Sequence, residues 1–554
     1  MSRLFNDHYK RHPIDYHSRK ARVQKFDYVI VGAGSAGCVL ANRLSENANN
    51  SICLIEAGGN DWSPFIHIPA GWASNFNNPR VDWGYHTAPE IELNERKIFW
   101  PRGKVLGGSS SINGMIYIRG VPMDFAAWEQ AGATGWSWEE VLPYYKKSER
   151  QQTHRDELHG ESGPLFVEDV RDKREVHDVY LDAMESVGIP RNADFNGKDQ
   201  AGAGYYQYTQ HNGRRWSAST AYLSPAKKRK NLTIISNAKA EKILFEGKKA
   251  HAIQVRRGGS TETIQAQHII LSGGSINSPQ LLELSGIGDG ERLHTLGIPL
   301  VHSNPDVGEH LQDHLLTKVV YGTLPEQSIN REVQGLRLIP TVMKWFLGRR
   351  GPLTTGSAPV GGFWYTREGL EAPDIQIHFA SGATLYNNEG KIEPLKIPAM
   401  TAVVNQSRPE SRGSIHIRTA ETSDAPEIHA NYLSAELDRQ TIIKGVRVLL
   451  DIFSAEPLQD HLTGRLSPDA DIDTSSDEEL LEYIREDAST VYHPTSTCSI
   501  GKVVDENLFV KGVSGLSIAD ASVMPYVVSG NTNAAAIMIG EKASDILKQS
   551  NQTP

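Results

Sequence analysis

Three glycines and one glutamate near the N-terminus have the types and the spacing that hold a dinucleotide. The apolar run FDYVIV leads into Gly32, Gly34 and Gly37, and a second apolar run further on ends in Glu56. In such a strand–helix–strand order, Gly32 permits the tight turn, Gly34 lets the backbone approach a pyrophosphate, and Gly37 lets helix and strand pack closely. Glu56 stands where a carboxylate accepts hydrogen bonds from ribose hydroxyls, so we expect a bound dinucleotide.

Three apolar runs mark strands of one parallel sheet. They cover residues 28–31, 269–271 and 516–519, and helical patterns follow each of them. Strands that alternate with helices favour a parallel α/β sheet. Because the runs lie at both ends and in the middle of the chain, this nucleotide-binding domain is expected to be discontinuous in sequence.

The stretches between these runs have a different pattern of apolar and polar residues. Residues 374–379 and 414–417 alternate between apolar and polar side chains, and residues 433–453 have a helical pattern. This mixture favours an antiparallel sheet covered by helices, in a second domain on the substrate side. The expected division is an N-terminal arm at 1–25, nucleotide-binding segments at 26–164, 216–315 and 481–554, and substrate-domain segments at 165–215 and 316–480.

Composition describes an ordinary globular protein of two or more domains. The 554 residues carry a net charge of −9, which argues against nucleic acid as a partner. No apolar run is long enough to span a membrane. The basic first 25 residues lack the apolar core of a secretory signal, and we interpret them as a solvated arm. Three cysteines without metal-ligand spacing indicate no disulfide framework, no metal site and a cytoplasmic location.

Five further segments resemble signature segments of the glucose–methanol–choline (GMC) oxidoreductases. They are WPRGKVLGGSSSINGMIYIRG from 100, SGGSINSPQLLELSGIG from 272, VGEHLQDH from 307, YHPTSTCSIG from 492 and GLSIADASVMPYVVSGNTNAAAIMIGEKASDIL from 515. The resemblance is specific in these motifs and weak over 320–480. It implies an α/β Rossmann-like FAD-binding domain with an α+β antiparallel-sheet substrate domain, FAD as the cofactor, and oxidation of alcohols to aldehydes or ketones.

The small residues of 107–116 support FAD, because they let backbone approach a planar ring; a loop without any ligand is the alternative. Some choline-oxidising relatives carry a flavin-linking histidine where this chain has Ile112, so FAD is expected to be non-covalent. Asp520 is expected either to contact FAD or to cap the turn that follows it. The expected cofactor-binding residues are Gly32, Gly34, Ser35, Ala36, Gly37, Glu56, Ala57, Trp83, Val105, Gly108, Asn113, Gly114, Met115, Ile116, Ala240, Tyr492, Asp520, Thr532 and Asn533.

The resemblance places two catalytic residues, His493 and Asn531, beside the flavin. An imidazole suits proton abstraction from an alcohol because its ordinary pKa lies near working pH. Asn531 can donate a hydrogen bond to the substrate oxygen but cannot be the base. Its alternative role is to cap the following helix, whose first N–H groups, at Thr532 and Asn533, would face the flavin. His314, in the LQDH segment, is interpreted as structural.

The sequence leaves the substrate and the electron acceptor open. We expect an uncharged primary alcohol, and either O2 or a quinone-type acceptor; the oligomeric state is not predicted. Trp345, Phe346, Phe363, Trp364 and Tyr365 either form an apolar pocket wall or pack in a core. Hydroxynitrile lyase activity, light-driven fatty-acid decarboxylation and non-catalytic FAD binding are the alternatives. Such lyases are secreted and disulfide-bearing, and the decarboxylation goes with a cysteine in the substrate domain, whereas no cysteine lies between 54 and 497 here.

Overall fold

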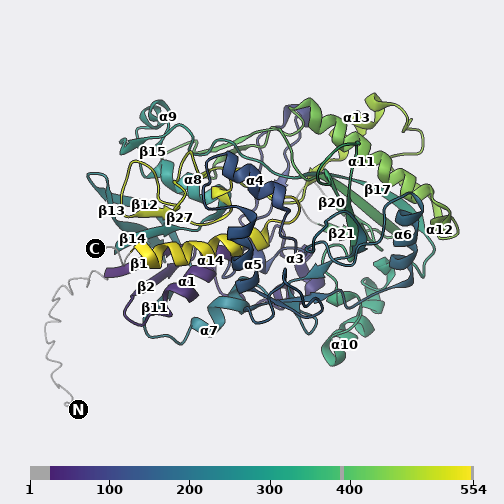
Figure 1. Ribbon diagram of the computed structural model, residues 1–554, viewed down its shortest axis with the longest axis horizontal. Helices are drawn as coiled ribbons and strands as arrows, with labels where there is room; N and C mark the ends of the chain where they lie inside the picture. The colour runs from purple at the N-terminus through teal and green to yellow at the C-terminus, as the bar shows by residue number, and fades with distance from the viewer. Residues whose placement is uncertain (1–24, 387–391, 551–554) are drawn as a thin grey trace, which may run out of the picture.

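The computed structural model describes residues 25–386 and 392–550 (Figure 1). The predicted basic arm, apart from Lys25, lies outside these residues. Two large sheets form the two ends of the molecule in Figure 1, with a mixed sheet that contains the parallel strands on the left and an antiparallel sheet on the right. Chain segments far apart in sequence meet in each sheet.

The first sheet contains all three apolar runs expected to share one. Its strands follow the order β11-β2-β1-β14-β13-β12, with β27 paired to β14. Strand β1 pairs parallel with β2 and β14, and β14 pairs parallel with β27, as predicted. The strands are β1 (Lys25–Val31), β2 (Ile52–Ile55), β11 (Leu232–Ile235), β12 (Ala238–Glu246), β13 (Lys249–Arg257), β14 (Ser260–Leu271) and β27 (Leu516–Ile518).

Helices cover this sheet as the apolar patterns indicate. Helix α1 (Ser35–Leu44) packs on α14 (Asn533–Ser550), which in turn packs on α5 (Trp138–Ser148). Helix α8 (Gly274–Leu284) follows β14 and packs against β12. Because α14 comes from the C-terminal end and α1 from the N-terminal end, the first and third segments of the chain close one core.

The second sheet is antiparallel, as expected for the substrate side. Its order is β25-β17-β22-β19-β18-β7, with β26 paired to β17. These strands are β7 (Gly202–Tyr205), β17 (Leu315–Thr323), β18 (Val360–Trp364), β19 (Ile375–Ala380), β22 (Ala399–Gln406), β25 (Leu462–Ser467) and β26 (Ser489–Thr490). Helices α6 (Glu175–Ser186), α11 (Glu436–Ser454) and α13 (Asp477–Asp487) lie beside it (Figure 1).

The two faces of this sheet have different surroundings. Val319, Phe379 and Val404 belong to the core that contains α11. Their neighbours along the strands, among them Leu316, His378 and Val403, line a large cavity instead. Alternation along a strand sends successive side chains to opposite faces. One face of the sheet therefore builds the core while the other forms a cavity wall.

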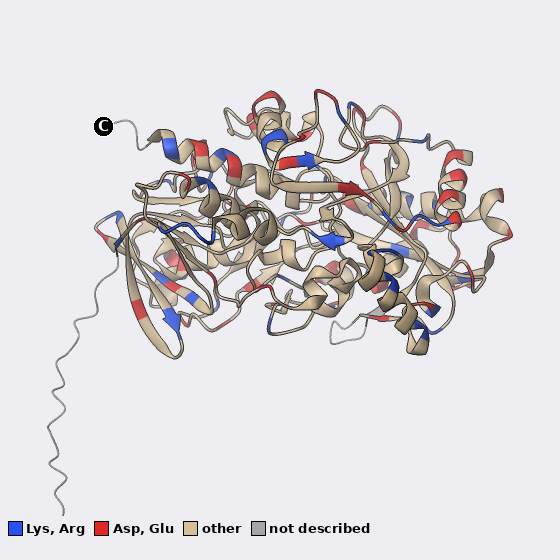
Figure 2. Ribbon diagram, turned by 90° about the horizontal axis from the view of Figure 1, so that it is seen from below, with Lys and Arg blue, Asp and Glu red and all other residues tan. Residues whose placement is uncertain are grey.

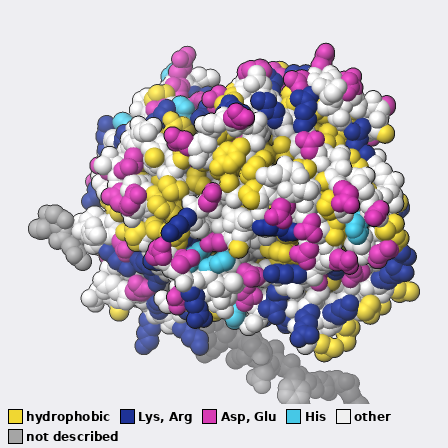
Figure 3. All heavy atoms as spheres, turned by 45° about the vertical axis from the view of Figure 1, so that its right-hand side comes forward, with side chains coloured by type: hydrophobic (Ala, Val, Ile, Leu, Met, Phe, Trp, Pro, Cys, Tyr) yellow, Lys and Arg dark blue, Asp and Glu magenta, His cyan; other side chains and the backbone are white. Residues whose placement is uncertain are grey.

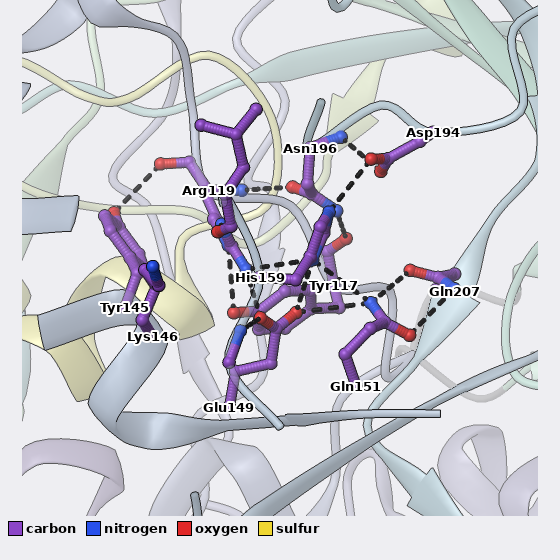
Figure 4. Close-up of polar contacts among 12 residues, drawn as sticks. Tyr117, Arg119, Tyr145, Lys146, Glu149, Gln151, His159, Asp194, Asn196 and Gln207 are labelled. Carbon is purple, nitrogen blue, oxygen red and sulfur yellow. Dashed lines mark hydrogen bonds and ion pairs between the residues drawn. The ribbon is translucent and has the colours of Figure 1, made fainter. Parts of the chain in front are cut away.

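A buried ion-pair network surrounds Arg119, which follows the cavity-lining residues 113–116 in sequence (Figure 4). Arg119 pairs with Glu149, and both side chains are fully buried. His159 lies between Glu149 and Asp194, with its Nδ1 3.2 Å from one carboxylate and its Nε2 2.9 Å from the other. Burial alone would lower the pKa of His159, but the bonds to Asp194 and Glu149 outweigh it and raise that pKa to about 9. His159 is therefore a cation that holds two carboxylates together.

Charged residues of both signs are interspersed over the ribbon (Figure 2). Within the described parts of the chain, no helix combines the length and the apolar character needed to cross a bilayer. Cys38, Cys53 and Cys498 are buried and free.

Candidate active site

A cavity of about 1230 Å³ lies between the two sheets. Its floor is formed by residues just after the carboxyl ends of β1, β2 and β14, at Gly32, Glu56 and Ser272. Ligands of open α/β sheets bind at this edge. Leu316, His378 and Val403 line the opposite side of the cavity, from the second sheet. The volume exceeds that of most small-molecule pockets and is suited to a long ligand plus a second, smaller one.

The glycine motif takes the conformation that its spacing predicts. Gly32 has φ of +102°, and a Cβ there would lie 2.4 Å from the carbonyl oxygen of Ser272. A Cβ on Gly37 would lie 1.9 Å from the carbonyl oxygen of Gly32, so helix α1 packs directly on the turn. Gly34, the N-cap of α1, carries no side chain to cap the first N–H groups of the helix. These groups lie at the cavity, where they suit a phosphate.

Glu56 is buried at the end of β2 and lines the cavity. Its two oxygens accept hydrogen bonds from the backbone N–H groups of Ala33 and Gly58, at 2.9 and 2.8 Å. Burial raises the pKa of this carboxyl to about 7, although both bonds act in the opposite direction. The carboxylate is thus held rigidly in the glycine turn, with accepting capacity left for a ligand hydroxyl.

Arg215 positions Asn113 at the cavity, and sequence reasoning did not identify this residue. Its Nη1 donates to Asn113 Oδ1 at 2.6 Å, and its Nε donates to the carbonyl of Ile66. The N–H of Met115 donates to the same Asn113 oxygen at 3.2 Å. With Oδ1 so engaged, the Nδ2 donor of Asn113 is left for the cavity. Burial lowers the pKa of Arg215 to about 9, and no ion pair within the described residues engages it.

The structure brings most of the expected site residues to one cavity. Gly37 and Val105 are the exceptions, since Gly37 packs under the glycine turn and Val105 is buried beside Ile112. Asp520 lines the cavity and also caps the following turn η8 (Ala521–Val523) by accepting from the N–H of Ser522. The residues that line the cavity are Gly32, Gly34, Ser35, Ala36, Glu56, Ala57, Trp83, Gly108, Asn113, Gly114, Met115, Ile116, Ala240, Tyr492, His493, Asp520, Asn531, Thr532 and Asn533.

None of the five bulky residues considered for a pocket wall lines the cavity. Trp345 and Phe363 are buried in packing, whereas Phe346 is 59% exposed. The apolar wall comes from other residues, including Phe65, Trp72, Leu316, Leu338 and Leu353.

His493 and Asn531 meet in this cavity, from segments 38 residues apart. The Nε2 atom of His493 lies 3.2 Å from Nδ2 of Asn531. The Oδ1 atom of Asn531 accepts a bond from Gln376 at 3.2 Å, so its amino group is the end that faces the histidine. Asn531 precedes α14, and the α14 residue Asn533 accepts a bond from Ser35 of α1 at 2.7 Å. The N-termini of both helices therefore open onto one cavity.

His314, interpreted from the sequence as structural, contacts the ring of His493 directly, and sequence reasoning did not identify this contact. Its Nε2 lies 3.0 Å from the carbonyl oxygen of Ser407, and its Nδ1 lies 2.9 Å from Nδ1 of His493. A carbonyl can only accept, so His314 Nε2 carries the proton. The bare Nδ1 of His314 must then accept from Nδ1–H of His493. This series of hydrogen bonds leaves the lone pair of His493 on Nε2, next to Asn531.

The preceding residue, Asp313, holds the backbone of the same histidine. One carboxylate oxygen accepts from the N–H of His493 at 2.6 Å, and the other accepts from Thr490 and Tyr432. The Asp-His pair of the LQDH segment thus fixes both the main chain and the ring of His493. The only sequence signal for this role was the motif itself, because the two segments lie 179 residues apart.

Burial keeps these imidazoles neutral. It lowers the pKa of His314 to about 4 and holds the pKa of His493 well below its usual value, with the neighbouring His314, Arg102 and His378 acting in the same direction. A neutral His493 with a bare Nε2 can take a proton. The site therefore contains an imidazole that can act as a general base, an amide donor beside it, and a cavity that extends to a dinucleotide-type turn.

Family models for the N- and C-terminal parts of GMC oxidoreductases match residues 26–316 and 409–540. An alcohol dehydrogenase [acceptor] of Pseudomonas putida is 41% identical over 94% of this chain and 95% of its own length. Mitochondrial choline dehydrogenase of Mus musculus is 38% identical over 95% of this chain and 89% of its own.

Solved structures agree with this assignment. Pyridoxine 4-oxidase from Mesorbium loti superimposes with a TM-score of 0.85 at 28% identity, covering 96% of this chain and all of that one. An Aspergillus oryzae formate oxidase variant, studied for its FAD modification, has a TM-score of 0.89 at 26% identity over 96% of this chain and 99% of its own.

The chain belongs to the GMC oxidoreductase family, and it is an FAD-dependent oxidoreductase that acts on CH–OH donors. The cavity fits this cofactor. The uncapped N-terminus of α1 suits the pyrophosphate, and the buried, positively charged Arg215 next to Asn113 has no carboxylate partner among the described residues. Ile112 lines the cavity where a covalent link would need a histidine, and the FAD is non-covalent.

Proposed function

We propose that this enzyme oxidises an uncharged primary alcohol, with His493 as the base and Asn531 as the residue that holds the alcohol oxygen. The observation that carries the proposal is the series of hydrogen bonds from Ser407 through His314 to His493. It fixes the tautomer of His493 and leaves its lone pair on the nitrogen beside Asn531. Bound FAD supplies the acceptor for the hydride that leaves the alcohol carbon.

The proton follows a short path. The substrate hydroxyl lies between His493 Nε2, which takes the proton, and Asn531 Nδ2, which donates to the oxygen as negative charge develops on it. Protonation makes His493 an imidazolium whose Nδ1–H stays bonded to His314. Tyr492, with φ of 67°, and the bond from Arg102 to its carbonyl at 2.6 Å keep this loop in position.

The cavity lining supports an uncharged substrate. Among the described residues that line it, Asp172 pairs with Arg174, Asp487 pairs with Lys318, and Glu486 lies at the exposed surface. The remaining two carboxylates, Glu56 and Asp520, are bonded to backbone N–H groups at the dinucleotide end. None of these five carboxylates bonds the side chain of His493 or Asn531, and Asp313, which accepts from the backbone N–H of His493, does not line the cavity. A cationic substrate would therefore lack a counter-charge at the base.

For FAD, we propose that residues 34–36 and Asn113 hold the pyrophosphate region, that Glu56 binds the adenosine ribose, and that residues 113–116, 532 and 533 hold the flavin. The electron acceptor is proposed to be O2 or a quinone-type compound. We also propose the division into an N-terminal arm (1–25), FAD-binding segments (26–164, 216–315 and 481–554) and substrate-domain segments (165–215 and 316–480). A cytoplasmic location is supported by three cysteines that are free and buried.

The test is anaerobic reduction of the enzyme-bound flavin by a panel of alcohols in the dark. We expect primary alcohols of aromatic or medium-chain aliphatic type to bleach the flavin absorbance, and choline to do so poorly. His493→Gln should slow bleaching about 100-fold to 10,000-fold while retaining FAD. Air or a quinone analogue, added afterwards, identifies the acceptor by the rate of reoxidation. If His493→Gln bleaches at the wild-type rate, the proposed base is wrong.

A further inference from the structure

Helix α10 (Leu338–Gly348) turns an apolar stripe toward solvent. Leu336 and Leu347 are 84% and 82% exposed, and Ile339, Met343 and Phe346 are between 49% and 60% exposed. The four residues within α10 follow the three- and four-residue spacing of one helix face, and Leu336 precedes them in the short helix η6 (Gly335–Arg337). The opposite face holds the helix to the protein, where Thr341 and Trp345 are buried and Trp345 Nε1 donates to the carbonyl of Gly213. The stripe is therefore presented outward by a well-anchored helix.

The charge around this stripe is positive, unlike that of the whole chain. Residues 333–351 contain no Asp or Glu, whereas Arg337, Lys344, Arg349 and Arg350 all lie within them. Lys344 comes directly after Met343 and so flanks the stripe by helical geometry. Arg337, Lys344 and Arg350 are exposed, and the described residues offer no ion-pair partner to any of them. In a protein of net charge −9, the segment that carries this exposed apolar stripe thus contains basic residues and no acidic ones.

The same helix borders the cavity. Leu338 and Val342, on the other flank of α10, line it, and Leu338 is 36% exposed, so the cavity reaches the surface here. Phe65 of α2 (Pro64–His67) also lines the cavity and is 50% exposed. It belongs to the same region, because α2 packs on η1 (Pro69–Gly71), η1 on η7 (Pro352–Thr354), and η7 on α10.

Figure 1 shows α10 at the lower edge of the molecule, away from the helices of both large sheets. Along the lower edge of the space-filling view, hydrophobic and Lys or Arg side chains lie next to one another (Figure 3). An exposed apolar surface of this kind marks a binding site when it is contiguous and rimmed by polar groups.

We propose that α10 docks this enzyme on the surface of an anionic lipid bilayer. The apolar stripe lies among the acyl chains near the headgroups, and the basic rim contacts lipid phosphates. An interfacial helix has this combination of a large apolar face, basic flanks and no membrane-spanning length. A second copy of this chain is less suited to the same surface, because it would bring two basic rims together. Docking in this way places the apolar end of the cavity against lipid.

Vesicle flotation with the FAD-loaded, full-length protein tests this proposal. Vesicles of phosphatidylcholine with phosphatidylglycerol should carry the wild type upward, vesicles of phosphatidylcholine alone should carry much less, and added salt should release it. Phe346→Glu combined with Ile339→Glu should abolish flotation. Arg337→Gln and Lys344→Gln should each weaken it about fivefold.

Ile91→Glu is the matched control, because Ile91 is 78% exposed in η2 (Ile91–Leu93), outside α10. It should float like the wild type. Circular dichroism and turnover of a water-soluble alcohol without vesicles should be unchanged in all variants, which excludes misfolding. The proposal is overturned if the wild type does not bind anionic vesicles or if the Phe346→Glu, Ile339→Glu variant binds them equally well. A wild-type dimer that this variant dissociates, without vesicle binding, would make the surface an interface between copies.

Discussion

Nδ1 of His314 lies 2.9 Å from Nδ1 of His493, and the two rings meet edge to face at an interplanar angle of 86°. A contact between these two nitrogens requires one of them to carry a proton and the other to be bare. The carbonyl of Ser407 decides which, because it bonds the far nitrogen of His314. A main-chain oxygen therefore selects, through two rings, the nitrogen on which His493 keeps its lone pair.

Replacement of His314 should impair the base without removing the cofactor. In His314→Ala the Nδ1–H of His493 loses its acceptor, so the ring can take the wrong tautomer or turn, and kcat should fall about 10-fold to 100-fold. His310→Ala is the control, because His310 bonds Asp306 at 2.8 Å and is partly exposed. Stopped-flow flavin reduction and bound FAD content measure the two effects. Equal loss of rate in both variants would contradict the role of His314.

The pH dependence of kcat/KM should show an acid limb below the ordinary histidine range. The proposed base must be neutral to act, and burial, His314, Arg102 and His378 all hold the pKa of His493 well below 6.5. Activity should therefore persist from neutral into mildly acidic pH and fall only as protonation of His493 sets in. A limb at or above pH 6.5 in the wild type would conflict with the structure.

Arg215 should contribute to FAD affinity through Asn113. Arg215→Met removes the bond that fixes Oδ1 of Asn113 and a buried positive charge, so we expect about 10-fold to 100-fold weaker FAD binding. Arg214→Met is the matched control, since Arg214 is exposed and adjacent in sequence. Fluorescence titration of the apoprotein with FAD gives both dissociation constants. A similar affinity in the two variants would exclude this role.

Gly34 and Gly37 should respond differently to alanine. A Cβ at Gly37 would lie 1.9 Å from the carbonyl oxygen of Gly32, so Gly37→Ala should reduce the free energy of unfolding by about 1–3 kcal/mol or more. At Gly34 the nearest atom to a Cβ is 3.8 Å away, so Gly34→Ala should leave the apoprotein stable. It should nevertheless weaken FAD binding, because the methyl group occupies space at the phosphate site. Thermal melts of the apoproteins and FAD titration separate the two outcomes.

His159 should stabilise the fold at neutral pH and lose this contribution in alkali. Its pKa in the folded state, about 9, lies above the ordinary 6.5, so its contribution is complete below pH 6.5 and disappears as pH rises through 9. His159→Gln should lower the free energy of unfolding at pH 6 by at most about 3 kcal/mol. The gap between wild type and variant should close above pH 9, as measured by denaturant melts. A gap that is independent of pH would contradict a cationic His159.

The parallel sheet and its discontinuity could be predicted because they depend on local signals. Each of the three apolar runs is recognisable alone, and β1, β14 and β27 pair in parallel as expected. The antiparallel strands β12 and β13, which extend the same sheet from β14, were not predicted. The bulky residues of 345–365 could not be placed, since an apolar side chain has the same pattern whether it packs in a core, lines a cavity or faces lipid. Trp345 and Phe346 are adjacent, yet one is buried and the other is exposed.

The sequence by itself determined the dinucleotide turn, since Gly32, Gly34 and Gly37 act through backbone conformation and close approach, which are properties of the local chain. Family resemblance in the motifs added His493 and Asn531. Only the tertiary structure decided how these two side chains are oriented, because the atoms that orient them come from His314, Ser407 and Gln376, in three other segments. A hydrogen-bond direction depends on which groups lie within about 3 Å in space, and sequence spacing does not contain that distance.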